Sequence, residues 1–230
     1  MNWEIGSYLA LSVLASSLGA AETRSKITVF VYNYAAVSSE VLALTEAEAS
    51  RIYQQAGIEI EWLDCPLATQ DAGQFHACQV PPGPTKLALR ILSQPMTERL
   101  RQAGDSFGFA MIPEDGTFAT VANVFSYDAE QLASRRGMRP GIILGHLAAH
   151  ELGHLLLGAG SHSPQGIMHV PWRLKELETV AQGLIVFRPQ EAEGMRMNIR
   201  GRRVARETSK NVHPCSSKLV SSDQLIPFCE

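Results

Sequence analysis

The hydrophobic pattern near the beginning of the chain changes from the period of a strand to that of a helix and back. Residues 26–32 are rich in β-branched and aromatic side chains and predict a buried strand. Apolar residues at helical spacing follow Ser39, which can cap a helix, and continue up to Gly57. Residues 58–62 then alternate apolar side chains with glutamate and predict a second strand.

Later segments continue both periods. Strand-like runs of apolar and β-branched residues recur at 87–92, 107–112 and 117–126. Helical periods recur at 141–158, 172–181 and 189–203. Residues 128–139 are polar and are interpreted as the connection into the first of these helices. At 230 residues and 45% hydrophobic composition, the chain is long enough to bury one core.

The most informative segment is the apolar helix predicted at 141–158, because it carries an H-E-x-x-H motif. His150 and His154 are four residues apart, so one helix face presents both imidazoles and they can bind the same ion. Glu151 lies beside them, where it can act on a water molecule. Residues of these types at this spacing predict a zinc-dependent hydrolase, with Gly158 ending the helix.

A catalytic zinc ion takes three protein ligands and keeps a fourth position for water, so one more ligand is expected. His162 is the candidate, since the glycine-containing break from Gly158 to Ser161 can reverse the chain and return a side chain to the ion.

Two alternatives for the third ligand are weighed against His162. His146 lies one turn before the motif, but three ligands in a row on a straight helix would span about 12 Å, too far for one ion. It is therefore interpreted as a packing or supporting residue. Glu176 or Glu178 would be the third ligand if the protein were gluzincin-like.

The stretch from His150 to Met168 resembles the metzincin metallopeptidases, whose pattern is H-E-x-x-H-x-x-G-x-x-H followed by a methionine-containing turn beneath the zinc. Here Gly158 and His162 lie four and eight residues after His154, where the family has three and six, so two residues look inserted. The resemblance implies that Met168 is the methionine of the turn.

The same resemblance implies the fold class. It is α+β, a metzincin-like (zincin) catalytic domain with a twisted mixed sheet, a backing helix, an active-site helix and a C-terminal helix. In the family an edge strand lies above the cleft, and residues 117–126 fall at that place in the sequence. A peptide substrate would bind such an edge by strand addition. The alternative for residues 117–126 is an ordinary core strand.

The motif also predicts a mechanism. Zinc lowers the pKa of its bound water and polarises the scissile carbonyl, while Glu151 accepts the proton of that water and passes it to the leaving amine. The prediction is a zinc metalloendopeptidase with one catalytic ion. Two alternatives stay open: a non-catalytic zinc-binding interaction domain, and a zinc amidase that acts on a non-protein amide.

The charge of the chain bears on its partners. With a net charge of −3 there is no electrostatic case for nucleic acid, and the arginine-rich stretch from Arg196 to Arg206 is interpreted as a solvated helix face. The expected partner is a peptide or protein substrate, and the oligomeric state stays open. No segment after the N-terminal apolar run has the length and hydropathy of a membrane span.

The N-terminus has the pattern of an export signal, an apolar run at 8–18 followed by the small residues Gly19, Ala20 and Ala21. The predicted organisation is a signal peptide at 1–21, a catalytic domain at 22–206 and a tail at 207–230, with a secreted or periplasmic location. An uncleaved anchor or a packed N-terminal helix is the alternative.

Four cysteines fit an exported protein with two disulfides. Sequence proximity favours Cys65 with Cys78 and Cys215 with Cys229, and the second pair would staple the tail. All three pairings are open from sequence alone. None of the cysteines has C-x-x-C spacing, which argues against a cysteine-ligated zinc site.

Overall fold

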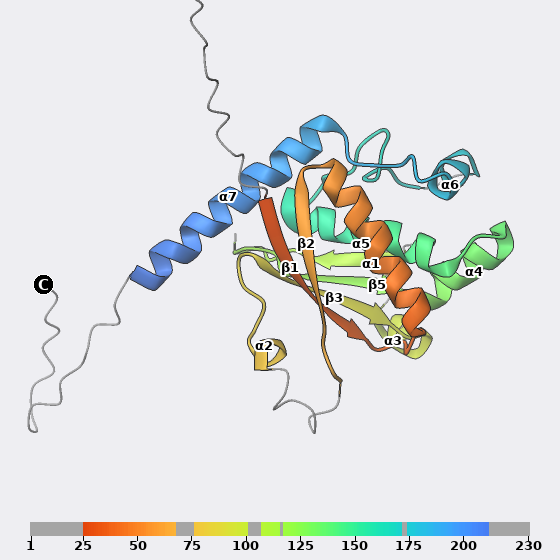
Figure 1. Cartoon of the computed structure of the whole chain (residues 1–230), viewed down its shortest axis with the longest axis horizontal. Coiled ribbons are helices and arrows are strands. Elements are labelled where there is room, and N and C mark those ends of the chain that lie inside the picture. Colours follow the sequence, from red (N-terminus) through yellow and green to blue (C-terminus); the bar gives the residue numbers. More distant parts are fainter. Residues whose placement is uncertain (1–24, 68–75, 101–106, 116, 172–173, 212–230) are drawn as a thin grey trace, which may run out of the picture.

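The computed structural model describes residues 25–67, 76–100, 107–115, 117–171 and 174–211. Within these residues five strands form one sheet in the order β2-β1-β3-β5-β4 (Figure 1). The strands are β1 (Ser25–Asn33), β2 (Ile58–Asp64), β3 (Lys86–Leu92), β4 (Gly108–Met111) and β5 (Val121–Phe125). Neighbouring strands are parallel except β4, which pairs antiparallel with β5. The chain thus has a mixed α/β fold.

Side chains along β1 point alternately to the two faces of the sheet, and their burial shows which face is the core face. Ile27, Val29 and Val31 are buried in the core, whereas Lys26 is exposed on the opposite face. The strands predicted at 26–32 and 58–62 are confirmed, and they lie side by side with Ser25 opposite Ile58. Two parallel strands need a crossover connection, and the helix between them supplies it.

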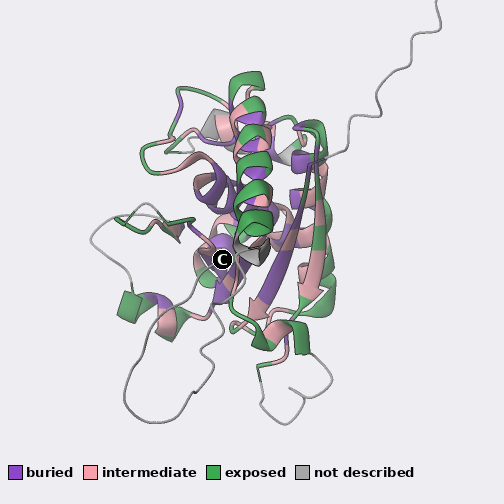
Figure 2. Ribbon diagram, turned by 90° about the vertical axis from the view of Figure 1, so that its left-hand side faces the viewer, coloured by how far each residue is buried: buried purple, intermediate pink, exposed green. Residues whose placement is uncertain are grey.

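Two long helices cover the core face of the sheet, α1 (Ser39–Gln55) and α5 (Pro140–Leu157) (Figure 1). They approach closely at Gly145, where an added Cβ would lie 2.7 Å from Cβ of Glu48. The cap of α1 is Ser38 and not the predicted Ser39, because the side chain of Ser38 accepts a hydrogen bond from the amide of Val41. Figure 2 shows buried residues concentrated between sheet and helices, with exposed residues on the outer sides.

Three helices were not predicted: α2 (His76–Gln79), α3 (Gln94–Leu100) and α4 (Ser126–Arg136). The segment interpreted as a polar connection at 128–139 is mostly α4. Its small buried residues Ala129 and Ala133 lie on one face at helical spacing, and Gly137 ends it in a left-handed conformation. Alanine supplies little hydrophobic contrast, so the polar residues of this helix dominated its sequence pattern.

The strand predicted at 117–126 is shorter than expected and is not at the edge of the sheet. It becomes β5, which pairs with β3 on one side and with β4 on the other. The edge strand is β4, within the run predicted at 107–112. The expectation of an edge strand at 117–126 is therefore wrong, because strand order depends on long-range pairing that the local pattern does not contain.

Two further helices follow α5, namely α6 (Leu174–Ala181) and α7 (Pro189–Asn211). The predicted ranges 172–181 and 189–203 correspond to them, and α7 continues beyond Arg203. Residues 172–173 lie outside the described residues, as do the predicted signal peptide at 1–21 and the tail from residue 212 onward.

The arginines of α7 are not all on a solvated face. Arg202 is almost completely buried, and its guanidinium donates to the carbonyl oxygens of Pro84 (3.1 Å), Ala119 (3.0 Å) and Leu155. Burial away from carboxylates lowers the pKa of Arg202 to about 10. Arg202 therefore joins α7 to the last turn of α5 and to the segments that precede β3 and β5.

One disulfide is present, between Cys65 and Cys78, which confirms the first pairing predicted from sequence proximity. Cys215 and Cys229 lie outside the described residues. Within the described ranges, every helix is too short or too polar to cross a membrane.

Candidate metal centre

The centre is built on the second half of α5. Pro140 stands at the start of this helix, where its missing N–H costs no hydrogen bond, and Gly158 ends it. The four-residue spacing places His150 and His154 on one face. His150 is buried and His154 is partly exposed, so the face opens toward solvent at its C-terminal end.

The chain reverses directly after α5 and brings His162 back to this face. Gly158 and Gly160 have φ values of 90° and 69°, in the left-handed region that favours glycine. After the reversal, Nε2 of His162 lies 3.1 Å from Nε2 of His154, which lies 3.1 Å from Nε2 of His150. We call His150, His154 and His162 the histidine cluster; its ligand atoms all lie within 4.8 Å of one another.

Hydrogen bonds at the other ring nitrogens orient the two helical histidines. Nδ1 of His150 lies 2.8 Å from the carbonyl oxygen of Ile167, and Nδ1 of His154 lies 2.8 Å from Oγ of Ser161. A carbonyl oxygen can only accept, so Nδ1 of His150 carries the proton and Nε2 of the neutral ring carries a lone pair. That lone pair points into the cluster.

The turn that contains Met168 lies against the same helix. Met168 is fully buried, and an added Cβ at Gly153 would lie 2.7 Å from its sulfur, so a glycine is required there. The amide of Ser163 donates to the carbonyl oxygen of Met168 (3.0 Å), and the amide of Ile167 donates to that of Val186 (3.0 Å). These bonds fix the carbonyl that orients His150.

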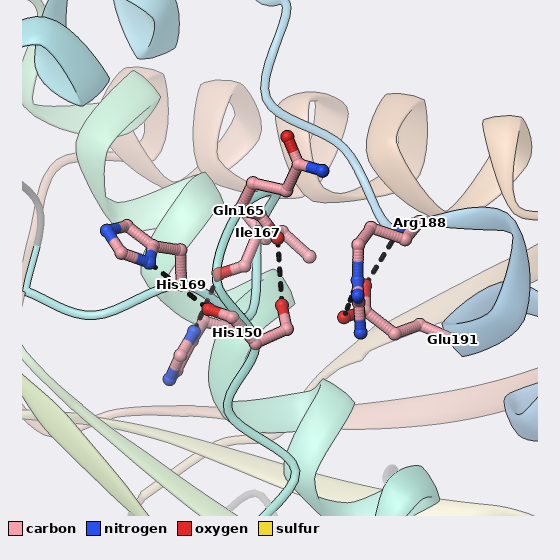
Figure 3. A network of polar contacts seen from close by, with 7 residues as sticks. His150, Gln165, Ile167, His169, Arg188 and Glu191 are labelled. Atoms are coloured by element: carbon pink, nitrogen blue, oxygen red, sulfur yellow. Dashed lines mark hydrogen bonds and ion pairs between the residues drawn. The ribbon is translucent and has the colours of Figure 1, made fainter.

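Figure 3 shows this turn from close by. His150 meets the backbone of Ile167 on one side, and His169 bonds through Nδ1 to the carbonyl oxygen of Ser163 at 3.1 Å. On the other side Arg188 bonds Glu191 through its backbone amide (2.8 Å) and through Nε (2.9 Å), at the first turn of α7. The turn thus lies between α5, through His150, and the segment before α7, through Val186.

The histidine cluster fits a zinc ion. Zinc binds imidazole nitrogen at 2.0–2.1 Å, so two ligand nitrogens of a tetrahedral site lie about 3.3 Å apart. The two measured separations of 3.1 Å are close to this value. Lone pairs of neutral rings at such distances repel each other unless a cation or a proton lies between them. Three histidines so arranged suggest zinc binding.

Electrostatics within the cluster favours neutral rings. Burial lowers the pKa of His150 to about 4, and burial together with the neighbouring His162 lowers the pKa of His154 to about 4. Metal ligation requires the unprotonated ring nitrogen. Near neutral pH, therefore, protons do not compete for these two ligand atoms.

Glu151 is only 6% exposed and lies under the edge of the sheet. An added Cβ at Gly108, the first residue of β4, would lie 2.9 Å from Oε1 of Glu151. Burial raises the pKa of Glu151 to about 8. Without a metal ion this carboxyl is therefore mostly protonated at neutral pH, and a nearby cation would lower its pKa and favour the carboxylate.

The rival ligands lie elsewhere. His146 faces α1, with Nδ1 at 3.0 Å from the carbonyl oxygen of Ile142 and at 3.5 Å from Oε1 of Glu48. Glu48 is itself held by Arg51 in a two-point ion pair. Among the described residues, the groups that could hold a metal ion do not include His146, Glu176 or Glu178.

Sequence reasoning missed two residues of the site. Ser161 was treated only as part of the break that follows α5, although a hydroxyl so close to a third histidine is placed to bond a ring nitrogen. Gly108 was treated only as part of a strand, although a glycine within an apolar strand often marks a close approach of another group.

Comparison with known proteins shows no family for this chain. No protein-family model matches the sequence, and no curated protein matches it. Among solved structures the chain is similar to archaemetzincin from Methanopyrus kandleri, at 14% identity and a TM-score of 0.47, over 78% of this chain and 99% of that chain. The chemistry of the site is therefore inferred from its own side chains.

Proposed function

We propose that the protein is a zinc-dependent metalloendopeptidase in which His150, His154 and His162 hold one zinc ion and Glu151 is the catalytic residue. The observation that carries the proposal is the convergence of three Nε2 atoms beside a buried carboxylate. When bound, zinc would supply an electrophile for the carbonyl and acidify water. Met168 would support the cluster from below.

Glu151 would take a proton from the attacking water and deliver it to the leaving amine nitrogen. A zinc ion at the histidine cluster would lower the raised pKa of this buried group, so Glu151 would be ionised and able to accept the proton. His150 is oriented through Ile167 and His154 through Ser161, so neither ring needs to rotate when the ion binds.

The substrate would bind along β4. The amide of Phe125 donates to the carbonyl oxygen of Phe107, so the alternation of an antiparallel ladder turns the backbone groups of Phe107 and Phe109 toward β5. Those of Gly108 and Ala110 then point to the other side, where no strand of the described residues pairs. An extended peptide could add there as a strand, close to Glu151.

A secreted or periplasmic location belongs to the same proposal. The Cys65–Cys78 disulfide supports it, because such bonds persist in oxidising compartments. An N-terminal sequence of the mature protein that starts after residue 20 or 21 would be the expected result of export.

The test is hydrolysis of a mixed pool of unstructured peptides, with zinc and with a chelator. Wild type should cleave only with zinc, and Glu151→Gln should lose at least about 1000-fold in kcat while it still binds zinc. The control is Glu130→Gln, at an exposed position on α4, which should match wild type. The pool should include blocked peptides, because an endopeptidase does not need free chain ends.

The other outcomes separate the alternatives. Equal cleavage by wild type and Glu151→Gln would contradict the role of Glu151. One zinc per chain without cleavage of any peptide would favour a zinc-binding interaction domain, and turnover of cell-wall amides in place of peptides would favour an amidase.

A further inference from the structure

Gly108 is the point at which the edge strand and the active-site helix meet. It is the first residue of β4, it is buried, and its Cα faces Glu151 of α5. A Cβ placed on it would lie 2.9 Å from both Cγ and Oε1 of Glu151, and 2.5 Å from the carbonyl oxygen of Asn123. Contacts below 3.0 Å essentially do not occur for real Cβ atoms, so any side chain here would displace one of these groups.

The carbonyl oxygen of Asn123 and the carboxylate of Glu151 differ in how easily they could move away from a Cβ at Gly108. Asn123 lies in β5, between β3 and β4, where its backbone pairs with Phe109, and its side-chain Nδ2 also donates to the carbonyl oxygen of Phe109 at 3.3 Å. Its carbonyl oxygen is therefore part of a rigid ladder. The carboxylate of Glu151 is the end of a flexible side chain and would be the first group to move.

We propose that Gly108 is the positioning residue that seats Glu151: the missing side chain lets β4 lie directly against the carboxylate, so a peptide strand paired with Gly108 and Ala110 is delivered to the proton acceptor. This inference rests on the proposed function for its catalytic meaning. The close contact between Gly108 and Glu151, which we call the seat of Glu151, can be tested without measuring enzyme activity.

The backbone of Gly108 gives the position its second role. Its N–H and C=O point away from β5, so the residue that makes room for Glu151 also offers the hydrogen bonds that would align the substrate. A single residue thus relates the substrate register to the carboxylate. A shift of β4 of about 1 Å would misalign the two and cost about 100-fold in rate.

The first measurement is kinetic, on the zinc-loaded full chain. Gly108→Ala should lower kcat about 100-fold, with KM changed less than about threefold and with one zinc still bound per chain. The matched control is Gly141→Ala, another tight glycine whose Cβ would lie 2.8 Å from Cβ of Leu44 on α1. It should lower the Tm but leave kcat within about twofold of wild type.

The second measurement is thermal unfolding in chelator, which needs no activity. Gly108→Ala should lower the Tm by about 5 °C in the wild-type background and by less than about half of that in a Glu151→Ala background, because the displaced carboxylate is then absent. The loss caused by Gly141→Ala should be the same in both backgrounds.

Equal losses of Tm for Gly108→Ala in the two backgrounds would overturn the seat, and an unchanged kcat would overturn its catalytic role. A wild type without chelator-sensitive cleavage would remove the proposed function. Background-dependent losses of Tm would still support Gly108 as the seat of Glu151 in that case.

Discussion

Each helical imidazole of the histidine cluster is oriented by a hydrogen bond at Nδ1, and the two acceptors are of different kinds. The Ile167 carbonyl belongs to a turn that several backbone bonds hold in place, whereas Ser161 lies in the reversal between α5 and His162. The hydroxyl of Ser161 is therefore the more easily removed of the two supports. Ser161 also lies next to His162 in the sequence.

Removing this hydroxyl should weaken metal binding. Ser161→Ala leaves Nδ1 of His154 without its partner, and loss of such a supporting bond typically lowers zinc affinity 10- to 100-fold. Competition with a chromophoric chelator measures this affinity directly. Ser134→Ala, at an exposed position of α4, is the control. An affinity for Ser161→Ala within twofold of wild type would show that the bond does not orient His154.

Glu151 should make the metal-free protein less stable as the pH rises. Its pKa is about 8 in the folded chain and near 4.5 otherwise, so the folded state binds more protons between these values. The stability that comes from the protonated group is present at pH 4.5 and is lost as the pH rises through 8. Glu151→Gln, which does not titrate, should be at least about 2 kcal/mol more stable than wild type at pH 9, below the limit of about 5 kcal/mol that this difference in pKa sets.

Unfolding in chelator at pH 5 and at pH 9 measures this difference. The Tm gain of Glu151→Gln should be small at pH 5 and about 5 °C larger at pH 9. Glu130→Gln should give no such change. A gain independent of pH would mean that Glu151 is not desolvated in the folded protein.

At the scale of elements, segments with a strong local signal could be predicted and those defined by their neighbours could not. The active-site helix was predicted to begin within one residue of its first residue, because Pro140 and Gly158 mark its ends and apolar residues fill it. The helix α4 was missed because alanines bury its inner face. The edge strand was wrongly expected at residues 117–126, because the order of strands depends on pairing across the whole sheet and not on the local sequence.

The same distinction applies to the site. His150, Glu151 and His154 follow from the period of one helix, and the chain reversal that returns His162 is signalled by Gly158 and Gly160. The contact between Gly108 and Glu151 joins residues 43 positions apart (151 − 108) and has no local signature beyond a glycine within a strand.

Arg202 donates to carbonyl oxygens of three separate segments, and its removal should be costly. Arg202→Met leaves the carbonyl oxygens of Pro84, Ala119 and Leu155 without this donor, and we expect a loss of about 3 kcal/mol. The control is Arg200→Met on the same helix, whose guanidinium is exposed and pairs only with exposed Glu193. That variant should lose less than about 0.5 kcal/mol. Urea denaturation measures both, and equal losses would contradict the structural role of Arg202.

At the scale of the whole molecule, the site depends on how separate segments are brought together. The three histidines come from α5 and from the reversal after it, Glu151 lies under β4, and the turn with Met168 bonds to Val186 in the segment before α7. Only in the folded chain do β4 and the segment before α7 lie against α5. A metal ion that binds the assembled histidine cluster would therefore stabilise the folded state as a whole.

Zinc should raise the melting temperature of the full chain, and the size of the effect can be assigned to the cluster. At free zinc 1000 times above Kd, binding contributes about 4 kcal/mol. For a domain of this size the Tm should rise by about 10 °C relative to chelator. Because the third ligand completes the site, His162→Ala should lose most of this rise, whereas Glu151→Gln should keep it, since Glu151 is not a ligand.

His76→Ala, an exposed histidine on α2, controls for the removal of an imidazole and should respond to zinc like wild type. If His162→Ala kept the full rise, the third ligand would have to be another residue, and His162 would be excluded from the site. If His162→Ala and Glu151→Gln both lost it, the carboxylate would belong to the metal shell. It could not then be free to act on water, because a ligand oxygen is held by the ion. The comparison of His162→Ala with Glu151→Gln thus separates metal binding from proton transfer. The sequence motif alone cannot separate these two roles, because it places them on neighbouring residues.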